Sequence, residues 1–91
     1  MNLHKLLEEI CNEFGQSVED VLSYCQKEEL NKVRRVFVHV AKKVHKYSFR
    51  FIAESLNRNN HTTALNHYRT ELNRSEMAVF EKFKNLETAP F

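Results

Sequence analysis

The sequence has one glycine, one proline and no tryptophan among its 91 residues. A phosphate-binding loop of the Walker type needs several glycines, so the single Gly15 excludes such a nucleotide site in this chain. Scarcity of glycine and proline also leaves few turn signals, which favours helices joined by short loops. We therefore expect residues 1–91 to form a single all-α domain of five to six helices.

The sequence also lacks long apolar runs and secretory features. No stretch approaches the roughly 20 apolar residues of a membrane helix. The opening residues, Met1 to Glu9, are acidic and lack the basic-then-apolar order of a signal peptide. Cys11 and Cys25 belong to no paired motif, so we expect reduced thiols, with Cys11 in the core. These features predict a cytoplasmic protein without membrane contact.

Candidate chemical sites are few. His39, His45, His61 and His67 do not form a pair at i, i+4 with a third ligand in sight. A zinc site would also need thiols closer than the two cysteines. Nothing in the sequence positions a Cys-His nucleophile pair. We expect no metal, no cofactor, no small-molecule substrate and no enzymatic activity.

Charge is distributed unevenly along the chain. Residues 1–26 contain one lysine and five acidic residues, a net charge of −4. Residues 27–74 contain eleven Lys or Arg and four acidic residues, a net charge of +7. Residues 75–91 contain two lysines and three acidic residues, which returns the whole chain to +2. A basic segment between acidic ends is what a phosphate-binding face requires, and chance clustering is the alternative.

Apolar residues recur at three- and four-residue spacing in several stretches, as in amphipathic helices. We expect helices over residues 2–14, 17–24, 28–47, 49–56 and 61–74, and a last one from 75 that includes Leu86, before a tail with Pro90. Gly15 should end the first helix, while Ser17 and Ser75 should cap the second and the last. The third has the broadest apolar face and should lie centrally. Its polar side carries Arg34, Arg35, Lys42, Lys43 and Lys46.

Residues 48–74 have the pattern of a helix-turn-helix. Ser48 can cap a helix whose apolar residues Phe49, Ile52, Ala53 and Leu56 share one face. The following turn, residues 57–60, is rich in Asn, which tolerates the left-handed backbone of a helix exit. Ala53 is small, as a close helix crossing requires.

The second helix of this pair offers a polar side to a ligand. Leu65, Tyr68 and Leu72 form its inner stripe, and the outer residues are Thr62, Thr63, Asn66, Arg69, Thr70 and Asn73. Short polar side chains can bond base edges or phosphates, and Thr methyls can contact thymine methyls. The pattern fits a recognition helix in a DNA major groove. An ordinary helical hairpin with a solvated polar face fits equally well.

The segment from about Ile10 to Leu72 resembles the C-terminal DNA-binding domain of the bacterial replication initiator DnaA. The most specific match is the run Asn60 to Asn66, which reads Asn-His-Thr-Thr-Ala-Leu-Asn and is similar to that family's Asp-His-Thr-Thr signature before an apolar pair. Supporting matches are Ser17-Val-Glu-Asp-Val-Leu-Ser, Arg34 near the start of the long helix, Ala41-Lys42 within it, and Ser48 four residues before Ile52. The resemblance implies a Trp-repressor-like helical fold.

The resemblance also implies site residues. It implies recognition-helix contacts from Asn60, His61, Thr62 and Thr63, and a backbone contact from Arg34. The expected DNA-binding set, with the outward and basic residues added, is Arg34, Lys42, Lys46, Ser48, Asn60, His61, Thr62, Thr63, Asn66 and Arg69. His61 falls near the inner stripe of the helical wheel, so a packing or capping role competes with base contact.

Two departures from the family bear on these expectations. The family has a basic loop before its long helix, with an Arg that enters the minor groove. Here residues 24–29 read Tyr-Cys-Gln-Lys-Glu-Glu, so we expect this loop to stand off the duplex. Asn60 replaces the signature acid and can donate as well as accept hydrogen bonds. The initiator's ATPase module is not in this chain, so we do not expect the chain to act as a replication initiator.

The sequence therefore predicts a small, sequence-specific binder of double-stranded DNA, such as a regulator or a replication accessory. The alternative is a protein-protein interaction module on a DNA-binding fold whose groove contacts have decayed. In either case the acidic, apolar-striped terminal helices could hold a protein partner or a second copy of the chain.

Overall fold

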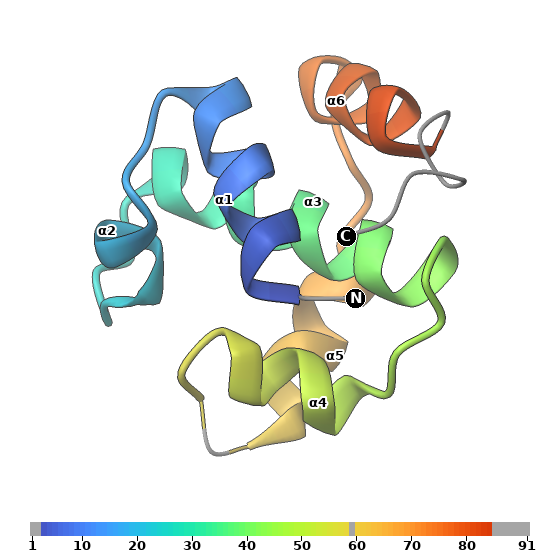
Figure 1. Ribbon diagram of the computed structural model, residues 1–91. Coiled ribbons are helices and arrows are strands. Elements are labelled where there is room, and N and C mark those ends of the chain that lie inside the picture. Colours follow the sequence, from blue (N-terminus) through green and yellow to red (C-terminus); the bar gives the residue numbers. More distant parts are fainter. Residues whose placement is uncertain (1–2, 59, 85–91) are drawn as a thin grey trace.

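The computed structural model describes residues 3–58 and 60–84, and these contain six α-helices and no strand (Figure 1). The helices are α1 Leu3–Phe14, α2 Val18–Leu22, α3 Glu28–Lys43, α4 Phe49–Ser55, α5 His61–Arg69 and α6 Arg74–Lys84. The expected all-α fold is confirmed. Leu86 and Pro90, placed by the sequence in the last helix and the tail, lie outside the described residues, as does Asn59 in the predicted turn.

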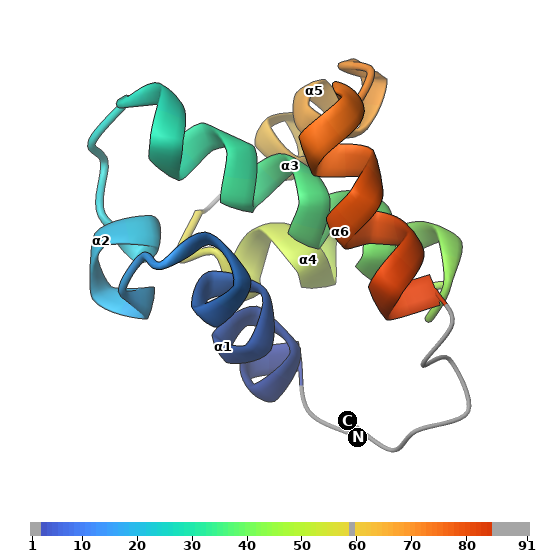
Figure 2. The ribbon, with the colours of Figure 1, turned by 90° about the horizontal axis from the view of Figure 1, so that it is seen from above.

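The central position of α3 is confirmed, because α3 contacts each of the other five helices. In Figure 1, α4 and α5 lie together below α3 and α6 lies above it. The view from above shows α1 and α6 flanking α3 (Figure 2). Val33, Val36, Phe37 and Val40 are fully buried on α3, and they belong to one cluster with apolar residues of the surrounding helices. The breadth of the apolar face of α3 thus places it at the centre.

The end of α1 and the start of α2 lie where local sequence signals predicted them. Gly15 ends α1 with a φ of +68°, a conformation that glycine adopts without strain. Ser17 caps α2 by accepting a hydrogen bond from the amide of Asp20 at 3.1 Å. Cys11 lies in the core as predicted, and burial followed by the charge of Glu8 raises the pKa of its thiol to about 11. Cys25 is exposed.

Helix boundaries differ from the sequence prediction at the end of α3 and at the start of α6. Helix α3 ends at Lys43 and does not continue to Tyr47. The segment that follows contains Lys46 with a φ of 60°, which is not a helical conformation. Ser75 does not cap α6. Asn73 takes that position, and its side-chain oxygen accepts a hydrogen bond from the amide of Glu76 at 2.8 Å. Asn73 precedes the first helical residue, Arg74, and Asn is as good an N-cap as Ser, so Asn73 caps the helix and Ser75 lies within it.

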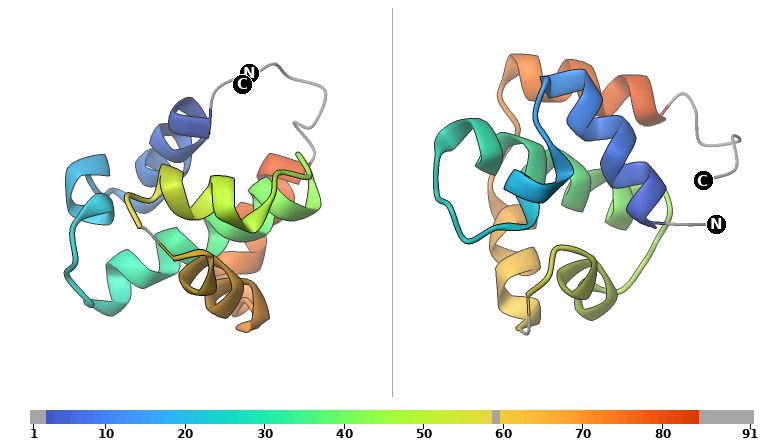
Figure 3. Two further views of the ribbon diagram at one scale, coloured as in Figure 1. Left: turned by 90° about the horizontal axis from the view of Figure 1, so that it is seen from below. Right: turned by 60° about the vertical axis from the view of Figure 1, so that its left-hand side comes forward.

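A buried ion pair fixes α6 to α3. Glu76 is 1% exposed, and its carboxylate accepts hydrogen bonds from Arg35 at 2.9 and 3.1 Å. Arg35 also pairs with Glu28, so its guanidinium lies between two carboxylates. Lys82 of α6 reaches Glu13 of α1. These pairs hold α6 at the end of the molecule opposite α4 and α5 (Figure 3, right).

Candidate nucleic-acid interface

The exit from α4 is a complete Schellman motif. Asn57 has a φ of 61°, as expected for an Asn at a helix exit. The amide of Asn57 donates to the carbonyl of Glu54 at 3.0 Å, and the amide of Arg58 donates to the carbonyl of Ala53 at 2.9 Å. Ala53 is buried, and its small side chain lies in the helix that packs directly against α5. The backbone of the turn is therefore fixed through Arg58, two residues before the cap of α5.

Asn60 caps α5. Its side-chain oxygen accepts a hydrogen bond from the amide of Thr62 at 2.9 Å, and its carbonyl accepts one from the amide of Thr63 at 3.2 Å. The capping bond engages the acceptor of the Asn60 side chain and leaves its amide group, a donor, directed elsewhere. An acid at this position could cap the helix equally well but could offer no donor. Contact between Asn60 and a base would thus favour a base that presents an acceptor.

The polar side of α5 is open to solvent. We define the reading face as His61, Thr62, Thr63, Asn66 and Arg69; four of these side chains are exposed, and that of Thr63 is half-buried. Because the side chain of His61 is exposed, it does not pack in the core, which was one of its expected roles. Spacings of four and three residues place Thr62, Asn66 and Arg69 along one side of the helix, and His61 and Thr63 flank this line at its amino end. The face carries hydroxyl, amide, imidazole and guanidinium groups, which can all bond base edges or phosphates.

The other side of α5 packs on α3 and α4. Ala64 is fully buried, while Leu65 and Tyr68 are half-buried. Helix α5 ends at Arg69, earlier than the expected residue 74, so Leu72 packs against the core from the segment after the helix. Burial, together with the nearby cations Arg34, Arg35 and Arg58, lowers the pKa of His67 to about 4. His67 is therefore neutral near pH 7 and adds no charge behind the reading face.

Three further residues predicted to frame the site lie on α3 and in the segment between α3 and α4. The hydroxyl of Ser48 caps α4 by accepting a hydrogen bond from the amide of Phe51 at 3.2 Å, and Ser48 is exposed. The ammonium of Lys42 lies 4.6 Å from the ring centroid of Phe49. Lys46 is exposed. Lys42 is half-buried, and none of the three is brought into direct contact with the reading face.

Arg34 does not have the role that the sequence predicted. It is 2% exposed, and its five N–H groups are all directed at protein acceptors. These acceptors are the carbonyls of Asp20, Val21, Ser23 and Cys25 and the side-chain oxygen of Asn31. No donor of Arg34 remains for a phosphate, so the expected backbone contact is wrong in this structure. Arg34 instead holds the chain between α2 and α3.

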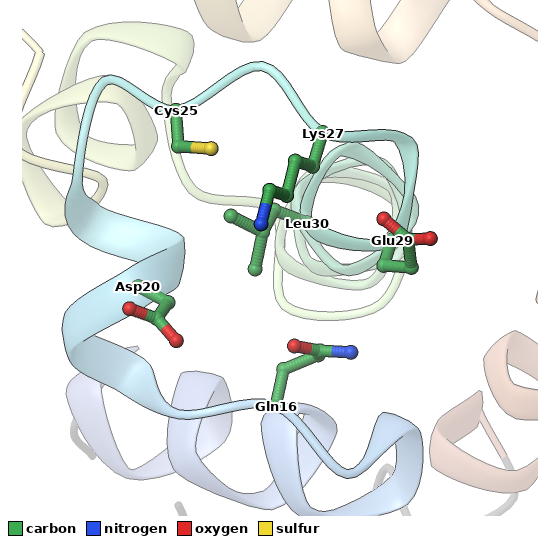
Figure 4. A pocket seen from close by; sticks show the side chains of 6 residues that line it. All are labelled: Gln16, Asp20, Cys25, Lys27, Glu29 and Leu30. Atoms are coloured by element: carbon green, nitrogen blue, oxygen red, sulfur yellow. The ribbon is translucent and has the colours of Figure 1, made fainter.

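The segment that Arg34 holds, residues 23–27, is named loop 23–27 below. It borders a pocket of about 560 Å³ lined by Gln16, Asp20, Cys25, Lys27, Glu29 and Leu30. In Figure 4 the side chains of Cys25 and Lys27 point into this pocket. Lys27 is the only basic residue of the loop, and it is exposed at the rim of this pocket. The large apolar side chain of the loop, Tyr24, is 70% exposed.

Arg58 is a further residue of this region, and the sequence pattern did not indicate it. Its guanidinium donates to the carbonyl of Ser23 at 2.7 Å and to that of Leu22 at 3.3 Å, and it lies 4.5 Å from the ring centroid of Tyr24. The available signal was an Arg at the second position after the helix, where the Schellman motif usually has an apolar residue.

Within the described part of the chain, no three His, Cys, Asp or Glu side chains converge in a way that could hold a metal ion. No helix of residues 3–58 and 60–84 is long and apolar enough to cross a membrane.

The family model described as the bacterial dnaA protein helix-turn-helix matches residues 3–70. The match begins with α1, covers the core helix α3 and includes all of α4 and α5. No curated protein and no solved structure matched the chain.

Proposed function

We propose that this chain, which belongs to the bacterial dnaA protein helix-turn-helix family, binds double-stranded DNA sequence-specifically. In this proposal the chain is one domain, and α5 enters the major groove. Its cellular role is that of a regulator or a replication accessory.

The observation that carries the proposal is the exposure of the reading face. A helical hairpin that serves only the fold has no need of a surface composed of two threonines, an asparagine, a histidine and an arginine. These residue types supply donors and acceptors matched to base edges. The amino end of α5, with Asn60, His61 and Thr62, is also the part of a recognition helix that contacts bases in helix-turn-helix proteins.

Phosphate contacts in this proposal come from the basic residues that remain at the surface. Lys42, Lys46 and Arg69 serve this role, and the hydroxyl of Ser48 can donate to a phosphate while its oxygen caps α4. Arg34 is excluded because its donors are engaged. Each retained cation that meets a phosphate makes binding more sensitive to salt, since bound counterions are released.

The alternative, an interaction module with decayed DNA contacts, is favoured by one observation. Arg34, Arg35 and Arg58 contribute to the basic excess of residues 27–74 but bond carbonyls and carboxylates of the protein. The cationic surface is therefore smaller than the sequence suggested. In this alternative a protein partner or a second copy of the chain replaces DNA.

A salt titration of binding to mixed-sequence duplex separates the two functions. The DNA-binding protein should lose affinity steeply as salt rises, with a log-log slope of about −0.9 for each phosphate contacted. An interaction module should bind little even at low salt.

The double variant Thr62→Ala/Thr63→Ala tests the reading face. Specific binding should weaken by roughly 1–3 kcal/mol for each lost base contact. Helical content should persist, because both residues lie on the first turn and their amides, not their hydroxyls, make the capping bonds. Affinity is measured on a selected site and on mixed sequence, and helicity by circular dichroism. Full retention of affinity and selectivity would exclude this docking mode.

A further inference from the structure

Arg58 links two parts of the molecule that are distant in the sequence. Its backbone is fixed by the Schellman motif at the end of α4, where its amide donates to the carbonyl of Ala53. Its side chain reaches loop 23–27 and donates to the carbonyls of Leu22 and Ser23. A further hydrogen bond, 3.2 Å to the carbonyl of Leu56, orients the guanidinium. Hydrogen bonds therefore fix both the backbone and the guanidinium of Arg58.

The contact on the loop side is shared with Arg34. The carbonyl of Ser23 accepts hydrogen bonds from Arg34 at 2.9 Å and from Arg58 at 2.7 Å. Arg34 belongs to the central helix α3, and Arg58 belongs to the turn of the helix-turn-helix. One carbonyl thus ties the turn to the core helix. Hydrogen bonds to charged donors are stronger than neutral ones, so this junction is well defined.

Tyr24 completes the contact from outside. Its ring lies 4.5 Å from the guanidinium carbon of Arg58, within the range of a cation–π interaction. With an exposed fraction of 70%, Tyr24 has little other packing. Arg58 is thus bonded at its edge by carbonyls and lies close to the Tyr24 ring. A planar guanidinium makes both kinds of contact at once, which an ammonium cannot.

The consequence for recognition follows from chain distance. Asn60, the cap of α5, is only two residues from Arg58, and His61 and Thr62 follow directly. Discrimination by base contacts depends on hydrogen-bond geometry at the angstrom level. We propose that Arg58 is a positioning residue for DNA readout, which fixes the amino end of α5 to loop 23–27, with Tyr24 as its stacking platform. This inference rests on the proposed function.

The proposal assigns loop 23–27 a role that needs no contact with DNA. Arg58 aligns the recognition helix from behind, so substitutions in the loop change base selectivity through the turn. The positioning effect concentrates on base pairs read by Asn60, His61 and Thr62. Base pairs or phosphates near Arg69, at the other end of α5, are affected less.

The test compares Arg58→Ala and Arg58→Lys with Arg50→Ala in the full chain. Arg50 lies in the same helix-turn-helix, is 86% exposed and pairs only with Glu54 among the ion pairs of the described residues, so its replacement removes the same charge without touching the loop. Selectivity is measured by competition between a selected site and single-base variants of it. Salt slopes are measured on mixed-sequence duplex.

Arg58→Ala should lose roughly tenfold in discrimination at base pairs read by the amino end of α5. Its salt slope on mixed sequence should equal that of Arg50→Ala. Arg58→Lys keeps the charge but not the planar fork, so it should lose discrimination while its salt slope equals that of the wild type. Tyr24→Leu should lose part of the discrimination, and Tyr24→Phe should retain it.

Two results would overturn the proposal. One is an equal loss of affinity by Arg58→Ala for every sequence with a slope smaller by about one unit than that of Arg50→Ala, which would make Arg58 a phosphate contact. The other is unchanged discrimination in Arg58→Ala. Absence of any discrimination in the wild type would refute the proposed function itself. In that case, backbone order parameters of Thr62 and Thr63 measured without DNA test the positioning role of Arg58 separately. Lower order parameters in Arg58→Ala but not in Arg50→Ala support this role, and unchanged order parameters in Arg58→Ala refute it.

Discussion

Replacing Arg34 by Met provides a sharp test of the reassignment of this residue from DNA contact to structural support. The substitution places an apolar side chain of similar length at a position that is 2% exposed. Ser23 keeps its bond from Arg58, but the carbonyls of Asp20, Val21 and Cys25 and the side chain of Asn31 lose their bonds from Arg34.

The size of the effect follows from these lost partners. Cys25 is an exposed residue, so its carbonyl can bond water instead, whereas Val21 is fully buried and its carbonyl cannot. A buried acceptor left unpaired costs about 1–3 kcal/mol, and each lost bond from a charged donor contributes a similar amount. Because part of this is recovered by hydration, we expect the free energy of unfolding to fall by about 3 kcal/mol. For a chain of this size that lowers the melting temperature by about 12–24 °C.

Thermal unfolding followed by circular dichroism measures this loss. Arg50→Met serves as the control, because its single ion pair with Glu54 is solvent-exposed and should change stability by no more than about 0.5 kcal/mol. The reasoning fails if Arg34→Met melts like the wild type and instead weakens binding to every duplex, with a salt slope smaller by about one unit. That outcome would restore the phosphate contact that the sequence suggested.

Three further predictions concern buried groups. Glu76→Gln leaves the Arg35 guanidinium without its buried carboxylate partner and should lower the free energy of unfolding by about 3 kcal/mol, measured by urea denaturation. Burial and neighbouring arginines depress the pKa of His67 in the folded state, so the unfolded chain binds its proton first as pH falls below the ordinary value of 6.5. Between pH 7 and pH 5 this should remove about 1 kcal/mol of stability, allowing for solvent screening of the half-buried ring. His67→Asn should abolish that part of the pH dependence, and an unchanged profile would contradict the assignment. A disulfide reagent at pH 8 should label Cys25 rapidly and Cys11 only on unfolding, because burial raises the pKa of the Cys11 thiol to about 11; equal labelling rates would contradict the buried site.

The helices could be predicted from the sequence because their signals are local. Gly15, Ser17 and Ser48 mark helix ends through their own backbone or hydroxyl chemistry, and the structure has each in the expected role. Asn57 likewise adopts the left-handed conformation predicted for the turn. Periodic apolar residues predicted which faces are buried. Such signals act within one turn of helix, so a single sequence contains them in full.

The hydrogen-bond partners of the arginines could not be predicted from such local signals. Arg34 bonds main-chain carbonyls, which every residue possesses and which therefore leave no trace in side-chain patterns. Arg35 pairs with Glu76, forty-one positions away, and Arg58 reaches Ser23 across thirty-five. A helical wheel places Arg34 on a polar side, but α2 and the following loop cover that side. The count of basic residues thus overestimated the cationic surface.

The candidate site lies between these cases. Exposure of Thr62, Asn66 and Arg69 follows from helical spacing alone, and the structure bears it out. The cap by Asn60 also follows from local rules, although it changes which group of that side chain is available. The link from Arg58 to loop 23–27 depends on how α2 and α4 pack in three dimensions.

Selection of bound sequences from a random duplex pool, performed in parallel with the wild type and with Thr62→Ala/Thr63→Ala, tests the central claim most directly. The wild type should enrich one short sequence. The variant should enrich the same sequence with degenerate positions where the amino end of α5 reads bases, since a lost base contact relaxes selection at its own position. Recovery of an identical sequence by both proteins would contradict readout through these threonines. Enrichment of no sequence by the wild type would contradict sequence-specific DNA binding.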